Sequence, residues 1–335
     1  MRSIINSIIN SISNAETPFP YQPGCALKPQ EVLGDEMEVL VTKLVSRTTS
    51  PVMEVKVKTE AGIQDAILKM YDRRFGAARG SRDAGASRPY CPHTSQSEEA
   101  LRDYEISGNL GRLLLQLSRE DDLKKPVNED VYGNCHGLDI PDRPPEPITK
   151  WEKLGRFEGT VHHRTQKTFS EEATAYNLLE ALQGECIPRC IAAITWSTPA
   201  SRIPISGLIL QHIPGFPLAE LVAQVPDDPP LWEDIIQKAM RAGEAINREG
   251  VVHMDFHARN ILVSKVGDRE FQVYVVDFGK CAFRQDFKET DDPQDPMGFL
   301  YHVRRVGNGP GIREKMKQKV YALTGVMLNL PGELR

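Results

Sequence analysis

Two acids and one amide in the last third of the chain have the residue types that phosphoryl chemistry requires. Asp255 is followed five residues later by Asn260, and Asp277 comes directly after the next apolar strand-like run. A polar turn around Gly267 separates the two strand-like runs, so a hairpin is predicted to return Asn260 and Asp277 to the same end. Mg²⁺ prefers one or two carboxylates together with phosphate oxygens and water, and a further carboxylate can orient a hydroxyl and accept its proton. The set therefore favours phosphoryl transfer to an alcohol.

The elements that must position these residues follow a segregated order. Apolar alternation and turn signals predict strands first, then an insertion, then further strands and finally helices. Strands are expected over 38–45, 53–57, 65–71, 191–196 and 207–213, with helices over 97–118 (interrupted near Gly108), 168–183, 232–246 and 311–329. The 168–183 helix is expected to begin at a capping box formed by Thr168 and Glu171. This order indicates an α+β fold in which the two halves are separate.

The same pattern predicts the domain organisation. Residues 1–30 form a Pro-containing tail, residues 31–213 a small sheet-based lobe, and residues 214–335 a helical lobe. The small lobe is interrupted by an insertion over 76–167, which is rich in Gly, Ser, Arg and Pro at its start and is longer than the connections of compact domains. Part of that insertion is expected to lack regular structure.

The signature around Asp255 has a counterpart in a known superfamily. His253-x-Asp255-x₄-Asn260, followed by Asp277-Phe278-Gly279, resembles the catalytic loop and metal-binding motif of the protein-kinase-like superfamily. The resemblance implies a two-lobed kinase-like fold with an antiparallel-sheet N-lobe and a reduced helical C-lobe. It also implies that Asp255 is the catalytic base, that Asn260 and Asp277 hold Mg²⁺, and that His253 braces the loop.

The resemblance extends upstream of the catalytic loop. Ala66-Ile67-Leu68-Lys69 looks like the strand that carries the ATP-clamping lysine of these kinases, which makes Lys69 the phosphate clamp. Glu172 is then its ion-pair partner, because the expected capping box already engages Glu171. The segment that would meet adenine through its backbone contains Gln211, His212 and Ile213. By this resemblance the cofactors are ATP and Mg²⁺.

Two features depart from the usual protein-kinase pattern. No glycine lies between Gly34 and Gly62, where a phosphate-covering loop is expected, although small hydroxyl residues there can still offer backbone N–H groups. His257 stands where kinases acting on serine or threonine place a lysine. The form HxDxHxxN resembles the aminoglycoside and choline phosphotransferase branch, and the chain also resembles kinase-like proteins of filamentous fungi. His257 either touches the γ-phosphate or packs structurally.

Composition limits the partners and the compartment. The net charge of −5 over 335 residues argues against nucleic acid or an anionic membrane as the main partner, and no apolar run is long enough to span a membrane. The cysteines are scattered and read as free thiols of a reducing compartment. We therefore expect an intracellular soluble protein, cytoplasmic by default with the nucleus left open. The sequence does not indicate an oligomeric state.

Two functions remain as hypotheses from the sequence. In the first, the chain is a kinase that transfers the γ-phosphate of ATP to a hydroxyl of a protein or a small molecule, because the polar residues that such catalysis needs are all present. In the second, it is a catalytically weak pseudokinase that acts as a binding or scaffold protein. The phosphate-covering loop without glycine and the long insertion motivate this alternative.

Overall fold

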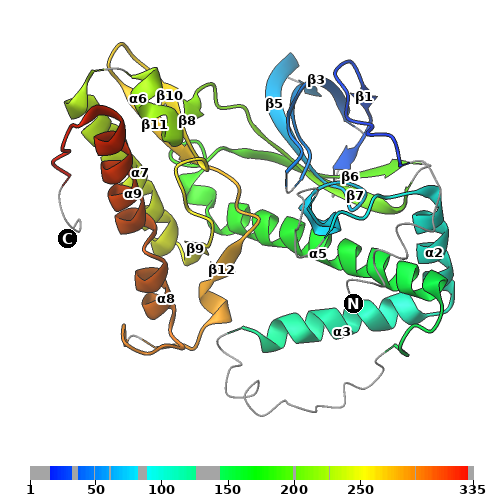
Figure 1. Cartoon of the computed structure of the whole chain (residues 1–335). Coiled ribbons are helices and arrows are strands. Elements are labelled where there is room, and N and C mark those ends of the chain that lie inside the picture. The colour runs from blue at the N-terminus through cyan, green and yellow to red at the C-terminus, as the bar shows by residue number, and fades with distance from the viewer. Residues whose placement is uncertain are drawn as a thin grey trace. The chain divides into compact units, whose positions relative to one another are not determined.

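The computed structural model of the chain describes residues 16–31, 37–48, 50–59, 62–81, 89–125, 144–198, 201–225, 227–290 and 292–330 (Figure 1). The chain divides into two compact units. The first contains residues 1–124, 131–169 and 191–210, and the second contains residues 125–130, 170–190 and 211–335. Residues 1–15 of the expected tail and the Pro-rich stretch 139–143 of the expected insertion lie outside the described residues.

The first unit is built on an antiparallel sheet. Among the described residues its strand order is β1-β3-β4-β5-β7-β6-β2. The strands span Ala26–Leu27 (β1), Gln30–Glu31 (β2), Glu38–Ser46 (β3), Val52–Thr59 (β4), Gly62–Tyr71 (β5), Cys190–Thr198 (β6) and Ser201–Gln211 (β7). Strands β3, β4 and β5 form a continuous meander, with Val55 opposite Val41 on one side and Ala66 on the other. The strands predicted over 38–45, 53–57 and 65–71 are confirmed as β3, β4 and β5.

Alternation of side chains explains why these segments pair as they do. In β3, Val39 and Val41 are buried whereas Leu40 and Thr42 face solvent, which is the period of two of a half-buried strand. The buried face joins residues of β4, β5, β6 and β7 in one apolar core. Tyr21, which precedes β1, is fully buried in this core, and its hydroxyl donates to Asp72 at 2.7 Å.

The helices of the first unit correct one prediction. The short helix η1 spans Ala77–Arg79, α2 spans Ser95–Ile106 and α3 spans Asn109–Leu123, with the expected interruption at Gly108 in the left-handed region. Helix α5 runs without a break over Lys150–Leu178, so the helix start and the capping box predicted at Thr168 are wrong. The Thr168 hydroxyl instead donates to the carbonyl of Arg164 within the helix.

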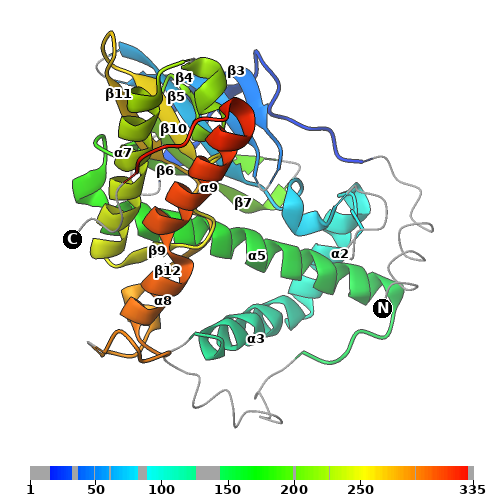
Figure 2. The ribbon, with the colours of Figure 1, turned by 60° about the vertical axis from the view of Figure 1, so that its left-hand side comes forward.

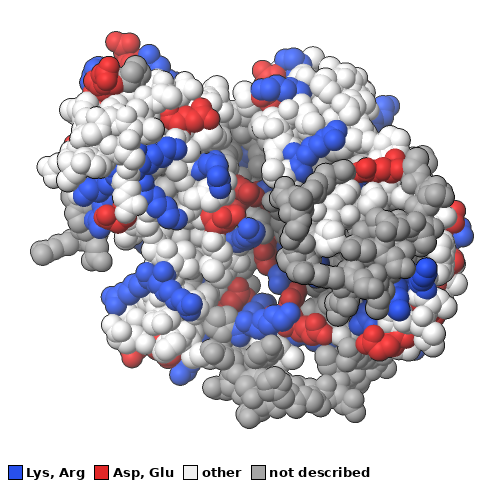
Figure 3. All heavy atoms as spheres, viewed as in Figure 1, with Lys and Arg blue, Asp and Glu red and all other residues white. Residues whose placement is uncertain are grey.

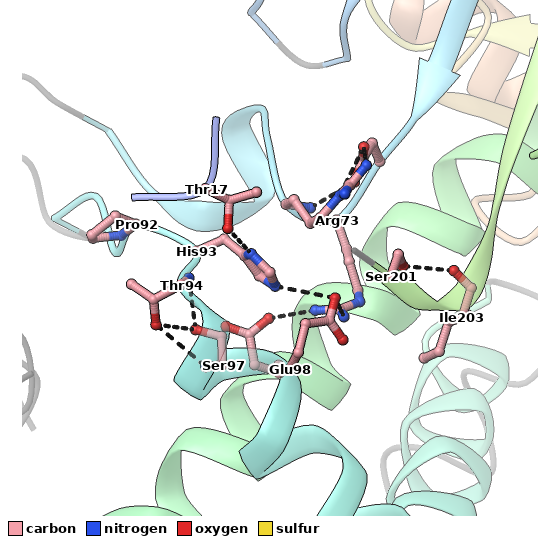
Figure 4. A network of polar contacts seen from close by, with 12 residues as sticks. Thr17, Arg73, Pro92, His93, Thr94, Ser97, Glu98, Ser201 and Ile203 are labelled. Carbon is pink, nitrogen blue, oxygen red and sulfur yellow. Dashed lines mark hydrogen bonds and ion pairs between the residues drawn. The ribbon is translucent and has the colours of Figure 1, made fainter. Parts of the chain in front are cut away.

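A buried ionic network ties α5 to the turn after β5 (Figure 4). The Glu158 carboxylate accepts from Arg73 at 2.8 Å and from Arg79 at 2.6 Å, and all three side chains are buried. Arg73 also bonds Glu98, which lies 3.4 Å from the His93 ring. On its other side, the His93 ring meets the Thr17 hydroxyl at 2.8 Å. Charges this deep require partners, because an isolated buried ion is costly.

Helices dominate the second unit. They are η3 (Glu180–Leu182), η4 (Leu218–Glu220), α6 (Leu221–Gln224), α7 (Pro229–Arg248), η5 (Arg284–Asp286), α8 (Phe299–Val306) and α9 (Asn308–Thr324). Asp228 caps α7 and Pro229 occupies its first turn, as helix starts prefer. Figures 1 and 2 both show α9 alongside α7. The predicted final helix is confirmed, although it starts and ends earlier than expected, and α8 was not predicted.

Two small sheets complete the second unit. One has the order β11-β10-β8, with β8 at Phe216–Pro217, β10 at Ile261–Lys265 and β11 at Phe271–Val275. The other pairs β9 (Val251–His253) with β12 (Cys281–Phe283). Gly215 lets the chain enter β8 against β10, because a Cβ there would lie 2.2 Å from the carbonyl oxygen of Val263. Strands β10 and β11 pair antiparallel, so the hairpin predicted around Gly267 is present.

The expected fold class is confirmed. An antiparallel curled sheet forms the first unit and helices with short strands form the second, in agreement with a two-lobed kinase-like fold. Within the described part of the chain, no helix combines the length and apolar character needed to cross a membrane.

Candidate active site

The loop from Met254 to Asn260 lies between the two small sheets of the second unit. Strand β9 delivers the chain to His253, which pairs with Cys281 of β12, and the Met254 N–H donates to the carbonyl of Lys280 at 2.9 Å. At its other end the loop enters β10 at Ile261, opposite Val275 of β11. The loop is therefore fixed at both ends by strand pairing.

His253 braces this loop from inside. Its ring is fully buried, Nδ1 accepts from the N–H of Asp255 at 3.1 Å, and Nε2 lies 3.2 Å from the carbonyl of Val276. Because Nδ1 accepts, the proton sits on Nε2 and is donated to Val276. Burial lowers the pKa of His253, so the ring is neutral at pH 7. One imidazole thus connects the residue before Asp277 to the backbone of Asp255.

Asn260 closes the loop from the other end. The side-chain Nδ2 of Asn260 donates to the backbone carbonyl of Asp255 at 3.1 Å. The backbone carbonyl of Asn260 accepts from the N–H of Val276 at 2.9 Å. This orientation leaves the amide oxygen as the end that can meet a cation. The predicted proximity of Asn260 to the start of Asp277-Phe278-Gly279 follows from these two bonds.

The Asp255 carboxylate has a basic group on each oxygen. Oδ2 accepts from Lys280 Nζ at 3.0 Å, and Oδ1 lies 3.5 Å from Nε2 of His257. The hydrogen bond from Lys280 is the main reason why the pKa of Asp255 is lowered, and the negative charge of Asp277 works against it. About a third of the Asp255 side-chain surface is exposed, so a substrate can reach it. At neutral pH this group is an accessible, ionised acceptor.

Asp277 adopts a backbone conformation that few non-glycine residues occupy. Its φ of 67° lies in the left-handed region, and such outliers concentrate at functional sites. The next residue, Phe278, is fully buried and packs against the rings of His253 (5.1 Å between centroids) and Tyr176 (5.5 Å). The turn therefore buries Phe278 and leaves Asp277 half-buried beside the loop.

Helix α5 contributes Glu172 and Tyr176 to the second unit. Both are buried on the same face of the helix, one turn apart. Burial, followed by the negative charge of Glu172, raises the pKa of Tyr176 well above its usual range. Glu171 is only half-buried, so Glu172 is the inward-facing acid, although the capping argument that selected it was wrong.

The remaining predicted residues lie on other elements. Lys69 is buried in β5 of the first unit, where its Nζ lies 5.7 Å from the centroid of the Tyr71 ring. In the second unit, the backbone N–H of Gln211 donates to the carbonyl of Arg189, and its side-chain oxygen accepts from Arg189 N–H. His212 is half-buried and Ile213 is buried. The Gln211 N–H is therefore already engaged within the protein.

The turn between β3 and β4 occupies the place of the expected phosphate-covering loop. Its Thr48 N–H donates to the Ser46 hydroxyl at 3.2 Å, and the two hydroxyls lie 3.0 Å apart. Ser50 is buried, and Thr49 lies outside the described residues. A hydroxyl side chain thus accepts the hydrogen bond of a backbone N–H within this turn. A glycine-rich turn has no such side chain, so its N–H groups stay available to a ligand.

The donor set fits a phosphate-bound magnesium ion better than a metal held by protein alone. Among the described residues, no group of three or more His, Cys, Asp or Glu side chains is arranged as a metal site. Asp277 supplies one carboxylate and Asn260 one amide oxygen, which is the sparse set that Mg²⁺ uses when phosphates and water complete its shell. The residues present therefore fit Mg²⁺ that arrives with a nucleotide.

Comparison with known proteins agrees with this geometry. Residues 207–298 match the model of the Lipopolysaccharide kinase (Kdo/WaaP) family. The matching segment runs from β7 through the hairpin to the residue before α8, so it contains the whole catalytic loop and Asp277. No curated protein matches the chain. The match supports a kinase-like phosphotransferase in general, whereas the resemblance to fungal proteins and to aminoglycoside or choline phosphotransferases stays a prediction.

Lys280 contacts the Asp255 carboxylate, and the sequence analysis did not single it out. It follows Asp277-Phe278-Gly279 directly, and strand pairing between β12 and β9 brings it to Asp255, 25 residues earlier. Its position directly after the motif was the available signal. A lysine is absent at position 257, but Lys280, the residue before β12, reaches the Asp255 carboxylate.

Proposed function

We propose that the protein transfers the γ-phosphate of ATP to a hydroxyl acceptor in a magnesium-dependent reaction. The observation that carries this proposal is the Asp255 carboxylate, accessible and ionised between His257 and Lys280, on a loop that His253 and Asn260 fix to the end of β11. Preorganised charge of this kind is the largest contribution that proteins make to phosphoryl transfer.

Each residue has a defined part in the proposed step. The acceptor hydroxyl donates its hydrogen bond to Asp255, its oxygen forms a bond to the γ-phosphorus, and the bond from that phosphorus to the ADP oxygen breaks. The proton of the hydroxyl passes to Asp255 and then to solvent. Asn260 and Asp277 would hold Mg²⁺, which when bound neutralises phosphate charge. Lys280 neutralises Asp255 in the resting state and lies where it can share its charge with the incoming phosphate.

The nucleotide contacts of the proposal come from the superfamily resemblance. Lys69 would clamp the ATP phosphates with Glu172 as its ion-pair partner, and the backbone from Gln211 to Ile213 would meet adenine. The burial of both Lys69 and Glu172 supports this part of the proposal, since such charges are rarely buried without a role.

The acceptor is a hydroxyl of a protein or a small molecule. The name of the matching family refers to lipopolysaccharide, so saccharide hydroxyls belong among the acceptors to test.

The alternative is a pseudokinase that binds partners without efficient catalysis. One observation favours it: in the turn between β3 and β4, the Thr48 N–H is engaged by Ser46 and is therefore not directed at a phosphate. A chain that holds nucleotide weakly would act through its surface.

Nucleotide turnover separates the two functions. We expect Mg-ATP to raise the midpoint of thermal unfolding, because a ligand that binds the native state stabilises it. ADP release should need both Mg²⁺ and an acceptor pool of saccharides, aminoalcohols and peptides.

Asp277→Asn should lower the apparent Mg²⁺ affinity by about tenfold or more, as loss of an ionised ligand does. A folded protein that shows neither a midpoint shift nor ADP release would favour the pseudokinase.

Substitution of Lys280 tests the charge arrangement at Asp255. We expect Lys280→Gln to lower kcat by about tenfold, less than loss of a fully enclosed oxyanion donor because Lys280 is exposed. Without the lysine the pKa of Asp255 rises toward its usual value, so the acid limb of the pH–rate profile should move to higher pH.

A matched control isolates this effect. Lys265→Gln removes an equally exposed lysine at the far end of the β10–β11 hairpin, where its nearest acid is Asp268 at 3.9 Å. Rate and pH profile should stay as in the unmodified protein. An unchanged acid limb in Lys280→Gln would show that the lysine does not act on Asp255 during turnover.

A further inference from the structure

A groove of about 890 Å³ lies in the second unit, formed by the end of α7, the turn after β12, α8 and the start of α9. Four exposed arginines line it, and we call it the arginine groove: Arg241, Arg248, Arg284 and Arg304. Figure 3 shows Lys and Arg atoms, in blue, over the region of α8 and α9. The groove does not include any residue of the proposed catalytic loop.

The positive charge of this groove is poorly compensated from within. None of the four arginines forms an ion pair with another described residue, and Glu244, which has a polar interaction of its own, is the single acid among the described lining residues. Arg284 is held in place by the Phe299 ring, 4.5 Å from its guanidinium carbon. In a chain with a net charge of −5, four converging guanidiniums create a local positive field that favours an anion.

The lining also specifies the kind of anion. Planar guanidinium groups match the oxygens of phosphate in two-point contacts, and for this reason arginine predominates at phosphate sites. Four of them, spread over three elements, exceed what one phosphate can engage. Between them the groove is lined by the half-buried side chains of Leu300 and Val303, next to the buried ring of Phe299. Such a lining suits a ligand with several phosphates and an apolar or ring-shaped body.

We propose that the arginine groove binds a small organic molecule that carries two or more phosphate groups. This site is separate from the proposed catalytic residues, and its existence does not depend on the kinase assignment. The ligand chemistry has two sources, a soluble polyphosphorylated metabolite and the headgroup of a phosphorylated lipid. Both present several phosphate groups on an organic body, and the experiment distinguishes between them.

Titration calorimetry with inositol hexakisphosphate tests the soluble source, and sedimentation with phosphatidylcholine vesicles containing phosphatidylinositol 4,5-bisphosphate tests the lipid source. We expect saturable binding of at least one probe, weakened about tenfold or more by Arg304→Gln, since bonds between charged groups are the strong ones. Binding of the soluble probe alone would assign the groove to a metabolite. Binding of the vesicles alone would assign it to a lipid headgroup.

Arg305→Gln is the matched control, because Arg305 is also exposed on α8 but does not line the groove. It should change affinity by about twofold or less, as expected of an exposed charge outside the contact. Three results would overturn the proposal: no binding of either probe, equal weakening by the two substitutions, or unchanged affinity in Arg304→Gln. Thermal midpoints of both variants should match the unmodified protein, since neither arginine has an ion-pair partner among the described residues.

Discussion

Asp255→Asn is expected to lower kcat for phosphoryl transfer by about 10²- to 10⁴-fold, the range that a positioned general base contributes. The amide keeps the shape of the carboxylate but cannot take the proton of the acceptor hydroxyl. In addition, an amide cannot balance the charge of Lys280, which lies 3.0 Å from Oδ2. The measurement is ADP release with Mg-ATP and the best acceptor found, under saturating conditions.

The pattern of retained properties makes this result specific. Asp255 contacts the acceptor in the proposed step, so the midpoint shift produced by Mg-ATP should persist in Asp255→Asn. Asp268→Asn, in the fully exposed hairpin turn, changes an acid to an amide far from the loop and should leave the rate unaltered. Equal rates for the unmodified protein and Asp255→Asn would refute the proposed role of the carboxylate.

Glu158→Gln is expected to destabilise the protein by about 3 to 5 kcal/mol, the usual cost of breaking a buried ion pair from one side. The substitution leaves Arg73 and Arg79 buried without the carboxylate that both of them bond. Chemical denaturation followed by circular dichroism measures the loss. Glu99→Gln, at an exposed position on α2, should change stability by no more than about 0.5 kcal/mol.

The buried Glu158 carboxylate also makes the stability of the protein depend on pH, with a definite sign. Burial by itself would raise the pKa of Glu158, but the charge of Arg79, helped by Arg73, outweighs it and lowers the pKa to about 2. Because this pKa lies below the ordinary value of 4.5, the stabilisation is complete above that value and is lost as pH falls toward 2. Glu158→Gln should lack this component of the acid transition. An identical acid transition in both proteins would contradict the ionic account.

Local patterns in the sequence were sufficient to predict the five longer strands of the sheet and the β10–β11 hairpin, but not the two-residue strands β1 and β2. The β3–β5 meander follows from side-chain alternation, and the β10–β11 hairpin from apolar runs around Gly267, so both are fixed by contacts between neighbouring segments. The same hairpin predicted that Asn260 and Asp277 lie at one end, and the N–H of Val276, the residue before Asp277, donates to the backbone carbonyl of Asn260. These predictions succeeded because each depends on residues within about 30 positions of one another.

Features that depend on distant residues were not predictable in this way. Glu158 meets Arg73 from 85 positions away, and neither residue has a local signal of its partner. The start of α5 was missed because Thr168 and Glu171 have the spacing of a capping box, which predicted a helix start inside what is a continuous helix. In the structure a Cβ at Gly155 would lie 2.7 Å from the carbonyl of Ala100, so this glycine serves the close approach of α2.

The hydrogen bonds of His253 have a consequence for the behaviour of the loop in acid. A second proton on this ring would have to sit on Nδ1, where it would point at the N–H of Asp255 and turn an attractive contact into a repulsive one. Burial lowers the pKa of His253, so this second proton binds at a lower pH than it would on an exposed histidine. Once it occurs, the backbone that presents Asp255 loses its internal support. The acid tolerance of the loop is thus governed by a buried ring that holds the backbone of Asp255 rather than by the exposed carboxylate.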